Sequence, residues 1–360
     1  MIEKQNNNKT SKNSTKINEK EKIIMKSKKA IMPSRILGMG WDFARSKALA
    51  TGVELNVFTH IADGKHTVDE IADAADSSSR GMEMLLDALV GLKLLKKQQK
   101  GNYYLAPDSG EFLVRGKPGF LGDMSMHTAQ LNEVWGHLTE SVKTGKPYMR
   151  VDEDKTAEDF FPALVKALFN MNYQAARYAA SFLKKKGRNI TNILDVAAGS
   201  CVWGIGFAQE FNITKLTAID FPSVCKVARE HAKNFQLDDR FECIEGDIRS
   251  IDFGNNSYDL VMLGHICHSE GKINTQKLLK KSYNALKAGG SLLIAEFMPN
   301  DEKTAPAIPL LFGLNMLVNT NEGAVYTIKE FQEWLTACEF KKIEILNKAP
   351  SISPLILATK

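Results

Sequence analysis

The sequence predicts an α/β protein in which a mostly helical part precedes a C-terminal part built on a mainly parallel sheet. Three observations support this prediction. From Asn192 onward, short apolar segments typical of strands alternate with helical segments, and such alternation implies right-handed crossovers between parallel strands. Seven strand-like segments are present, and the last two have no helix between them. We therefore expect an antiparallel partner at one edge of the sheet. Before Asn192 the apolar residues follow the period of helices.

Composition favours a globular protein and places the basic excess in a terminal tail. The chain has 360 residues, of which 44% are hydrophobic and 25% charged, as is ordinary for a folded protein. Residues 1–30 contain nine Lys and three Glu, so they account for the whole net charge of +5. We expect residues 1–32 to form a disordered basic tail. The tail lacks the apolar region of a secretory signal, and we expect no membrane-spanning segment.

The five cysteines are scattered along the chain and are odd in number. None of them stands in the C-x-x-C spacing that metal sites and redox motifs commonly use. We therefore expect a reduced, cytoplasmic protein.

The segment 33–115 shows the element order of a winged helix, in which helices are followed by a strand pair at 99–107. Thr67 and Glu70 match the capping box that begins a helix. The third helix, 80–95, is nearly neutral and apolar almost all round. A helix that reads a DNA groove exposes basic and amide side chains instead. We therefore expect this part to mediate dimerisation and expect no nucleic-acid partner, with a DNA-binding winged helix as the alternative.

A nucleotide cofactor is predicted at the carboxyl ends of the first two strands of the sheet. The first strand ends in LDVAAGSCVWG, where small residues lead directly into a helix. Small side chains let a ligand approach the backbone and the N–H groups of the helix. Asp220 ends the second strand, 21 residues after Gly199, and its carboxylate can accept hydrogen bonds from both hydroxyls of a ribose. These features suit either a nicotinamide or an adenosyl cofactor.

Three further features favour S-adenosylmethionine over a nicotinamide cofactor. Asp195 lies at the end of the first strand, where it could position the amino-acid part of the ligand. The segment EGDI ends the third strand with Asp247, which can reach the adenine amine. The chain also ends without a second nucleotide-binding half. The sequence GSCVWG matches the dinucleotide motif G-x-G-x-x-G only in part, because its middle residue is Cys201.

The segment LGHICHSEG, residues 263–271, concentrates two histidines, a cysteine and a glutamate. A zinc site needs three or four ligands, and side chains of an extended segment alternate in direction, so we predict no metal. A Cys267 nucleophile activated by His268 has no evident oxyanion donor. His268 follows the fourth strand and Glu296 lies late in the fifth, so both reach the same edge of the sheet. Glu296 can then bind one ring nitrogen of His268 and leave the other as a base.

Taken together, these motifs resemble those of class I S-adenosylmethionine-dependent methyltransferases: ILDVAAGSCVWGIGFAQEF, LTAIDFP, EGDI, YDLVMLGHICHSEG and LKAGGSLLIAEF. The chain from about residue 33 to 360 resembles the small-molecule O-methyltransferases with a winged-helix dimerisation domain, the group that contains caffeate and acetylserotonin methyltransferases. The resemblance implies a Rossmann-like seven-stranded methyltransferase domain, a homodimer and a small hydroxyl-bearing acceptor. It also implies four parts: a tail (1–32), a winged-helix dimerisation domain (33–115), a helical linker and lid (116–188) and the cofactor-binding domain (189–360).

The resemblance assigns roles to individual residues. His268 is the general base, and Glu296 orients it. The remaining assignments concern the cofactor: Asp195, Ala197, Gly199 and Cys201 surround the methionine part, Asp220 with Phe221 holds the ribose, Asp247 with Ile248 faces adenine, and Gly264 with His265 flanks the adenine or the methyl donor.

The sequence departs from the family pattern at three places. The family loop D-x-G-x-G-x-G here has Ala197 and Cys201 in place of two glycines. Positive φ at either position would strain the backbone and weaken cofactor binding. Ser269 stands where an aspartate often follows the base, and Val325 where a second acid is common. These departures leave two alternatives open, a cofactor-binding but inactive homologue and a methyltransferase that acts on carbon or nitrogen.

The acceptor pocket is expected between the middle helices and the segment after the fifth strand. Methionine and aromatic side chains suit a flat apolar ligand, and Asn315 is a candidate polar anchor. Phenolic, polyketide and pigment-like acceptors all fit such a pocket. The predicted lining residues are His127, Trp135, Phe297, Met298, Phe312, Asn315 and Met316.

Overall fold

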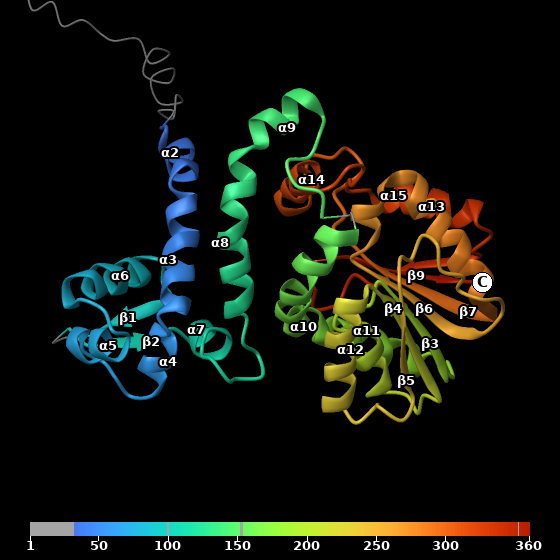
Figure 1. Ribbon diagram of the computed structural model, residues 1–360, viewed down its shortest axis with the longest axis horizontal. Helices are drawn as coiled ribbons and strands as arrows, with labels where there is room; N and C mark the ends of the chain where they lie inside the picture. Colours follow the sequence, from blue (N-terminus) through green and yellow to red (C-terminus); the bar gives the residue numbers. More distant parts are fainter. Residues whose placement is uncertain (1–31, 99–100, 152–153, 352) are drawn as a thin grey trace, which may run out of the picture. The chain divides into compact units, whose positions relative to one another are not determined.

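The computed structural model describes residues 32–98, 101–151, 154–351 and 353–360 (Figure 1). The chain divides into two compact units at Arg45, which are described separately below. The predicted tail, apart from Met32, lies outside the described residues. Within the described ranges, no helix is both long enough and apolar enough to cross a membrane.

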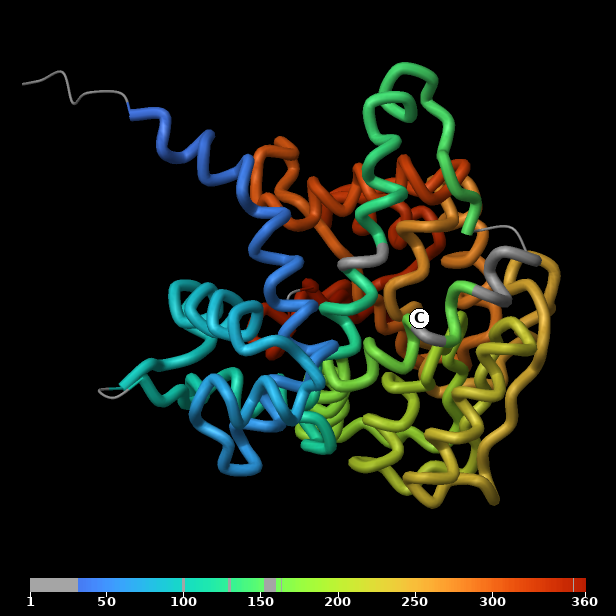
Figure 2. Tube along the Cα trace, turned by 60° about the vertical axis from the view of Figure 1, so that its left-hand side comes forward, coloured from blue at the N-terminus to red at the C-terminus, as the bar shows by residue number. Residues whose placement is uncertain are grey.

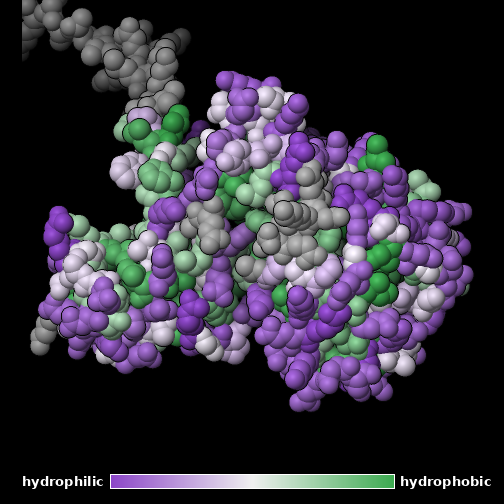
Figure 3. Space-filling model, viewed as in Figure 1, coloured by the Kyte–Doolittle hydropathy of each residue, from purple (hydrophilic) through white to green (hydrophobic). Residues whose placement is uncertain are grey.

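The first unit exposes apolar side chains. It contains helix α2 (Ser34–Gly40) and the beginning of α3 (Asp42–Glu54), which continues into the second unit. Six large apolar side chains here are between 61 and 69% exposed: Met32, Ile36, Leu37, Met39, Trp41 and Phe43. Figure 3 shows hydrophobic surface, in green, on several parts of the molecule. A single chain therefore leaves this apolar surface open to solvent.

The second unit begins with the predicted winged-helix order. Short helices precede an antiparallel strand pair in which Leu95 pairs with Leu105. Thr67 and Glu70 form the predicted capping box, since each side chain accepts a hydrogen bond from the backbone N–H of the other residue. The elements are α4 (Val57–Ala62), α5 (Val68–Ala74), α6 (Ser79–Gly91), β1 (Leu95–Lys97) and β2 (Tyr103–Leu105).

The segment between the wing and the sheet is helical, as predicted. Its last helix, α10, is 32 residues long and packs along α11 and α12 of the sheet domain (Figures 1 and 2). The elements are α7 (Pro107–Phe112), α8 (Gly122–Gly136), α9 (Leu138–Thr144) and α10 (Asp154–Lys185).

The sheet has seven strands in the order β5-β4-β3-β6-β7-β9-β8. All neighbouring pairs are parallel except those of β9, which runs antiparallel to both β7 and β8. The predicted antiparallel strand is β9, which lies next to the edge strand β8 and not at the edge itself. Strand order reverses between β3 and β6, where ligands bind in such sheets. The strands are β3 (Asn192–Val196), β4 (Lys215–Asp220), β5 (Phe241–Glu245), β6 (Tyr258–Gly264), β7 (Leu286–Ala295), β8 (Lys342–Ile345) and β9 (Leu355–Thr359).

Helices cover both faces of the sheet, because successive strand residues point to opposite sides. Ile193 belongs to the core cluster that includes α10 and α11, whereas its neighbour Leu194 belongs to the cluster that includes α13 and α15. This double burial explains the continuous apolar runs of the strands. The remaining helices are α11 (Val202–Ala208), α12 (Pro222–Asn234), α13 (Cys267–Ala285), α14 (Ala307–Asn319) and α15 (Ile328–Ala337).

Two of the five cysteines are joined in a disulfide. Cys225 of α12 and Cys243 of β5 form it across 18 residues of sequence, whereas Cys201, Cys267 and Cys338 are free and buried. The expectation of a fully reduced protein is therefore wrong for this pair. The two partners meet only because α12 packs beside the edge strand, which cysteine spacing does not reveal.

Candidate active site

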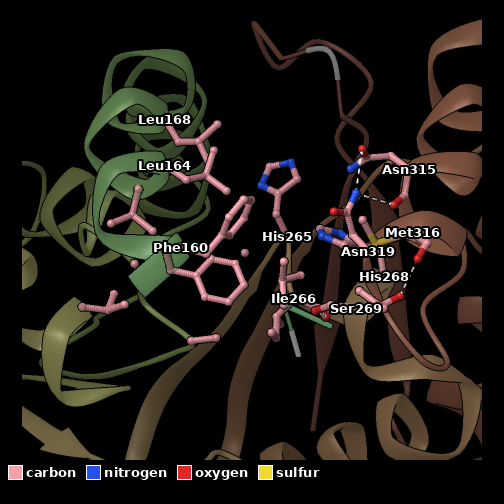
Figure 4. A pocket seen from close by; sticks show the side chains of 18 of the residues that line it. Phe160, Leu164, Leu168, His265, Ile266, His268, Ser269, Asn315, Met316 and Asn319 are labelled. Atoms are coloured by element: carbon pink, nitrogen blue, oxygen red, sulfur yellow. Dashed lines mark hydrogen bonds between the residues drawn. The ribbon is translucent and has the colours of Figure 1, made fainter. Parts of the chain in front are cut away.

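A cavity of about 650 Å³ opens where β3, β4 and β6 end. Apolar side chains of α10, including Phe160, Leu164 and Leu168, form one wall. Residues of α14 form the opposite wall, and His265 and His268 lie between the two (Figure 4). The cavity therefore occupies the carboxyl edge of the sheet, as predicted.

The loop between β3 and α11 has three residues in the left-handed region. Ala197, Gly199 and Cys201 have φ angles of 51°, 58° and 58°. Glycine adopts such angles freely, whereas other L-residues incur a cost of about 1–2 kcal/mol each. The predicted backbone strain at the two replaced glycines is therefore present in the structure.

Asp195 and Cys201 lie beneath this loop and not in the wall of the cavity. Asp195 Oδ2 accepts hydrogen bonds from the Gly204 N–H at 2.9 Å and from Cys201 Sγ at 3.6 Å. The Asp195 carboxyl is buried, and burial raises its pKa to about 7. The prediction that these two side chains surround the methionine part is corrected: they hold the loop from below.

Two other carboxylates face the cavity from the ends of β4 and β5. Asp220 Oδ2 accepts from the Gly199 N–H at 2.8 Å, and its Oδ1 accepts from the Phe221 N–H at 2.8 Å. Asp247 accepts from Arg249 Nε at 3.0 Å on both of its oxygens. Ala197, Ile248 and Gly264 also line the cavity. Small loop residues beside two carboxylates provide acceptors for ribose hydroxyls and an adenine amine, so the site fits an adenosyl cofactor.

His268 and Glu296 form a hydrogen-bonded pair at the adjacent ends of β6 and β7. His268 Nδ1 lies 2.8 Å from Glu296 Oε2, and the backbone N–H groups of His268 and Phe297 donate to the same carboxylate at 3.1 Å. Although burial alone would raise the pKa of Glu296, the attraction and hydrogen bonds of His268 lower it overall. Glu296 is 2% exposed and does not line the cavity, whereas His268 does. The carboxylate thus lies behind the ring.

The backbone turns sharply before His268. Strand β6 ends at Gly264, His265 has a φ of 61°, and α13 begins at Cys267. His268 is therefore in the first helical turn, so the alternation expected of an extended segment does not apply to it. Cys267 is fully buried beneath the cavity. Among the described residues, no group of three or more His, Cys, Asp or Glu side chains could hold a metal ion.

His265 has a different partner from His268. Its Nε2 lies 2.8 Å from Ser353 Oγ, in the loop before β9. Burial lowers the pKa of His265 to about 4, so its imidazole is neutral near pH 7. The ring lines the cavity beside Trp203 and Phe297.

At two positions where the family pattern often has an acid, this chain has no carboxylate that could assist His268 and Glu296. The Ser269 hydroxyl donates to the Ile266 carbonyl at 2.9 Å. Val325 packs near Gly313 and does not line the cavity. Glu270, the glutamate of the segment 263–271, is a buried acid at the cavity wall, 4.0 Å from Arg249 Nε.

The far end of the cavity contains six of the seven predicted acceptor residues: His127, Trp135, Phe297, Phe312, Asn315 and Met316. Trp135 Nε1 donates to Asn315 Oδ1 at 3.0 Å, and Asn319 Nδ2 donates to the Asn315 carbonyl at 2.9 Å. Met298 is the exception, because it packs in the core beneath the sheet. Sequence interpretation missed Asn319, Phe160 and Trp203, although the helical spacing of Asn319 from Asn315 could have indicated the first.

Because the backbone is strained at Ala197, replacing this residue with glycine should not destabilise the protein. Ala197→Gly removes the cost of about 1–2 kcal/mol that a non-glycine residue incurs in the left-handed region. It also raises the conformational entropy of the unfolded chain, which destabilises the folded state by about 0.4–1 kcal/mol. We expect the variant to match or exceed the parent in the free energy of unfolding, measured in urea. Ala198→Gly is the matched control, since Ala198 has no positive φ, and it should lose stability. Equal losses in both variants would contradict the strain.

The raised pKa of Asp195 predicts that the stability of the fold depends on pH. Its unfolded carboxyl titrates near 3.8, whereas burial raises the pKa of the folded group to about 7. The folded state binds more protons between these values, so this group makes the free energy of unfolding fall as pH rises from about 4 to about 7. The free energy of unfolding is measured in urea at several pH values for the parent and for Asp195→Asn. The parent's value minus that of the variant should fall as pH rises. Parallel profiles would refute the assignment.

Comparisons with known proteins agree with this geometry. The family model of the O-methyltransferase domain matches residues 135–341, and that of the O-methyltransferase dimerisation domain matches residues 41–115. The chain is 28% identical over 321 residues to the tetracenomycin polyketide synthesis 8-O-methyl transferase of Streptomyces glaucescens, covering 86% of this chain and 92% of that one. It is 27% identical over 333 residues to human acetylserotonin O-methyltransferase, covering 88% and 95%.

Two solved structures share the fold over nearly their whole length. An O-methyltransferase structure from Nostoc punctiforme superposes with a TM-score of 0.83 at 28% identity, covering 92% of this chain and 100% of that one. Human N-acetylserotonin methyltransferase in complex with S-adenosylmethionine gives 0.79 at 25% identity, covering 92% and 99%. The chain therefore belongs to the O-methyltransferase family, and it is an S-adenosylmethionine-dependent enzyme.

Proposed function

We propose that this enzyme methylates a hydroxyl group of a small aromatic or polyketide-like acceptor, with His268 as general base and Glu296 as the group that orients it. The observation that carries the proposal is the 2.8 Å contact between His268 Nδ1 and Glu296 Oε2. It uses one ring nitrogen and leaves Nε2 for the acceptor. The relatives that act in tetracenomycin synthesis and on acetylserotonin support an acceptor of this class.

The cofactor is assigned to the loop and carboxylates at the sheet edge. Backbone groups of residues 197–200 would hold the methionine part, Asp220 the ribose hydroxyls and Asp247 the adenine amine. When bound, S-adenosylmethionine supplies a methyl group already activated by the sulfonium charge. The protein's remaining tasks are to align the acceptor oxygen and to remove its proton.

His268 is suited to remove that proton. A protonated hydroxyl is a poor nucleophile, and a positioned base contributes about 10²–10⁴-fold in rate. As His268 takes the proton, it becomes an imidazolium, which the ionised Glu296 stabilises. The carboxylate is itself fixed by two backbone N–H groups, so one acid can orient the ring without the second acid of the family pattern.

The acceptor end combines apolar walls with a small polar cluster. Phe160 and Phe312 present ring surfaces that suit a flat ligand. Asn319 is 2% exposed, and its Oδ1 is buried without a hydrogen-bond partner among the described residues. Asn315 and Asn319 both line the cavity here, so a second hydroxyl or an N–H group of the acceptor would have polar side chains beside it.

Two observations favour a second candidate, a cofactor-binding homologue without turnover. Ala197 and Cys201 are held at positive φ, and Ser269 and Val325 supply no acid to the base. Methylation at carbon or nitrogen is compatible with the same features, because an amine nitrogen or an electron-rich aromatic carbon can attack the methyl group before it loses a proton.

We also propose a homodimeric, cytoplasmic enzyme in which residues 33–115 mediate dimerisation, residues 116–188 link and cover the site, and residues 189–360 bind the cofactor. The dimerisation-domain match supports the assembly. The exposed apolar side chains between Met32 and Phe43 supply a surface for a second copy.

The base assignment predicts a selective loss of turnover. His268→Ala should lower kcat by about 10²-fold or more and leave S-adenosylhomocysteine affinity nearly unchanged, because the ring faces the acceptor side. Turnover is measured with labelled S-adenosylmethionine and an acceptor identified from a panel of phenols and naphthols, and affinity by calorimetry. His137→Ala, an exposed histidine outside the cavity lining, is the control and should leave both intact. Unchanged turnover of His268→Ala would disprove the assignment.

A further inference from the structure

Asp247, the proposed partner of the adenine amine, lies on a short turn of the chain that follows β5. The N–H group of Ile251 donates to the Asp247 carbonyl at 3.0 Å, which closes residues 247–251 into that turn. Asp247, Ile248 and Arg249 line the cavity. Strand β5 is at the edge of the sheet, with β4 as its neighbour. The sheet therefore supports this turn from one side.

Lys281 supports the turn from outside the sheet. It lies in α13, and its Nζ donates to the carbonyls of Ile248 at 2.6 Å, of Arg249 at 3.4 Å and of Ile251. A lysine ammonium has three N–H donors, so the number of donors matches the number of carbonyls. Nζ also lies 4.1 Å from the centroid of the buried Phe253 ring, within the range of a cation–π contact. The side chain is thus held at the centre of the turn.

The ammonium also acts on the turn through its charge. Burial lowers the pKa of Lys281, whereas the carboxylates of Asp252 and Asp247 raise it. The Asp247 carboxylate is therefore close enough to attract the ammonium, in addition to the hydrogen bonds between Lys281 and the backbone. One side chain from α13 thus fixes both the backbone of the turn and the acid that the turn carries into the cavity.

The chemistry of the nucleobase defines what a fixed acid can recognise. The 6-amino group of adenine donates hydrogen bonds, and a carboxylate accepts them. A 6-oxopurine has an oxygen at the same position, and this oxygen repels a carboxylate. An acid held in place discriminates between the two bases, whereas an acid on a loose turn can move away from the oxygen and discriminates less.

We propose that Lys281 is a positioning residue, which holds Asp247 toward the adenine amine and so sets the preference of the cofactor site for adenine over a 6-oxopurine. The three contacts of Nζ with the carbonyls of the turn carry this inference. It rests on the proposed placement of the adenine beside Asp247, and it concerns ligand binding only.

The test measures two dissociation constants by calorimetric titration of the full chain, one for S-adenosylhomocysteine and one for S-inosylhomocysteine, which has the 6-oxo group. The parent should prefer the adenine ligand about 10- to 100-fold, because hydrogen bonds to charged groups are strong. Lys281→Met keeps an apolar stem but removes the charge and the N–H donors, so it should lower this preference about 3- to 10-fold. Equal weakening of both ligands would show a purely structural role and overturn the proposal.

Lys277→Met is the matched control. Lys277 is exposed on α13 and donates to Asn274 of the same helix at 3.3 Å, so its loss should leave the preference unchanged. A fall in preference like that of Lys281→Met would contradict the proposal, because it would trace the effect to the charge of the helix. If Lys281→Met does not fold, Lys281→Gln supplies the test, since its amide keeps two N–H donors but is one bond shorter. Its preference should also fall, and an unchanged preference would overturn the proposal.

Asp247→Ala distinguishes a failure of this inference from a failure of the proposed cofactor placement. If Asp247→Ala removes the preference and Lys281→Met does not, the positioning role alone is overturned. If the preference survives in Asp247→Ala, the adenine does not lie beside this acid, and the positioning role is overturned with the placement. Since no turnover is measured, an error in the base assignment would not alter these results.

Discussion

The parallel register of β6 and β7 is the constraint on which the active site depends. Leu263 pairs with Ile294, and Gly264 pairs with Ala295, so the chain leaves both strands at the same height. The residues that follow are thereby brought together, and His268 can bind Glu296 although 28 residues separate them. The pairing of β3 with β6 brings the cofactor loop to the same edge. One hydrogen-bonded sheet thus brings the loop proposed for the methyl donor, the proposed base His268 and its partner Glu296 to one edge.

Two buried acids maintain the strained loop on that edge. Asp195 binds the Gly204 N–H from below, and Asp220 binds the Gly199 N–H from the neighbouring strand. Each acid comes from a strand in the interior of the sheet, so one contact fixes the middle of the loop and the other fixes the first turns of α11 that follow it. These contacts offset the cost of left-handed angles at Ala197 and Cys201. Asp220 also lines the cavity, where we propose that it binds the ribose hydroxyls.

Sequence patterns predicted the elements well because strand burial on both faces leaves continuous apolar runs, as in β3 and β6. They also predicted the pair His268 and Glu296, because residues at the ends of parallel strands meet. They did not reveal the position of β9 inside the edge or the Cys225–Cys243 disulfide, since both depend on which strands are neighbours. The placement of Met298 was missed because adjacent residues after a strand face opposite sides, and Phe297 took the cavity.

We propose that Glu296 acts on catalysis through His268. A double-mutant cycle tests it most directly, with kcat measured for the parent, His268→Ala, Glu296→Gln and the double variant. Glu296→Gln should lower kcat in the parent but cause no further loss once His268 is absent, because groups that act as a unit are not additive. Independent, additive losses in the double variant would contradict it.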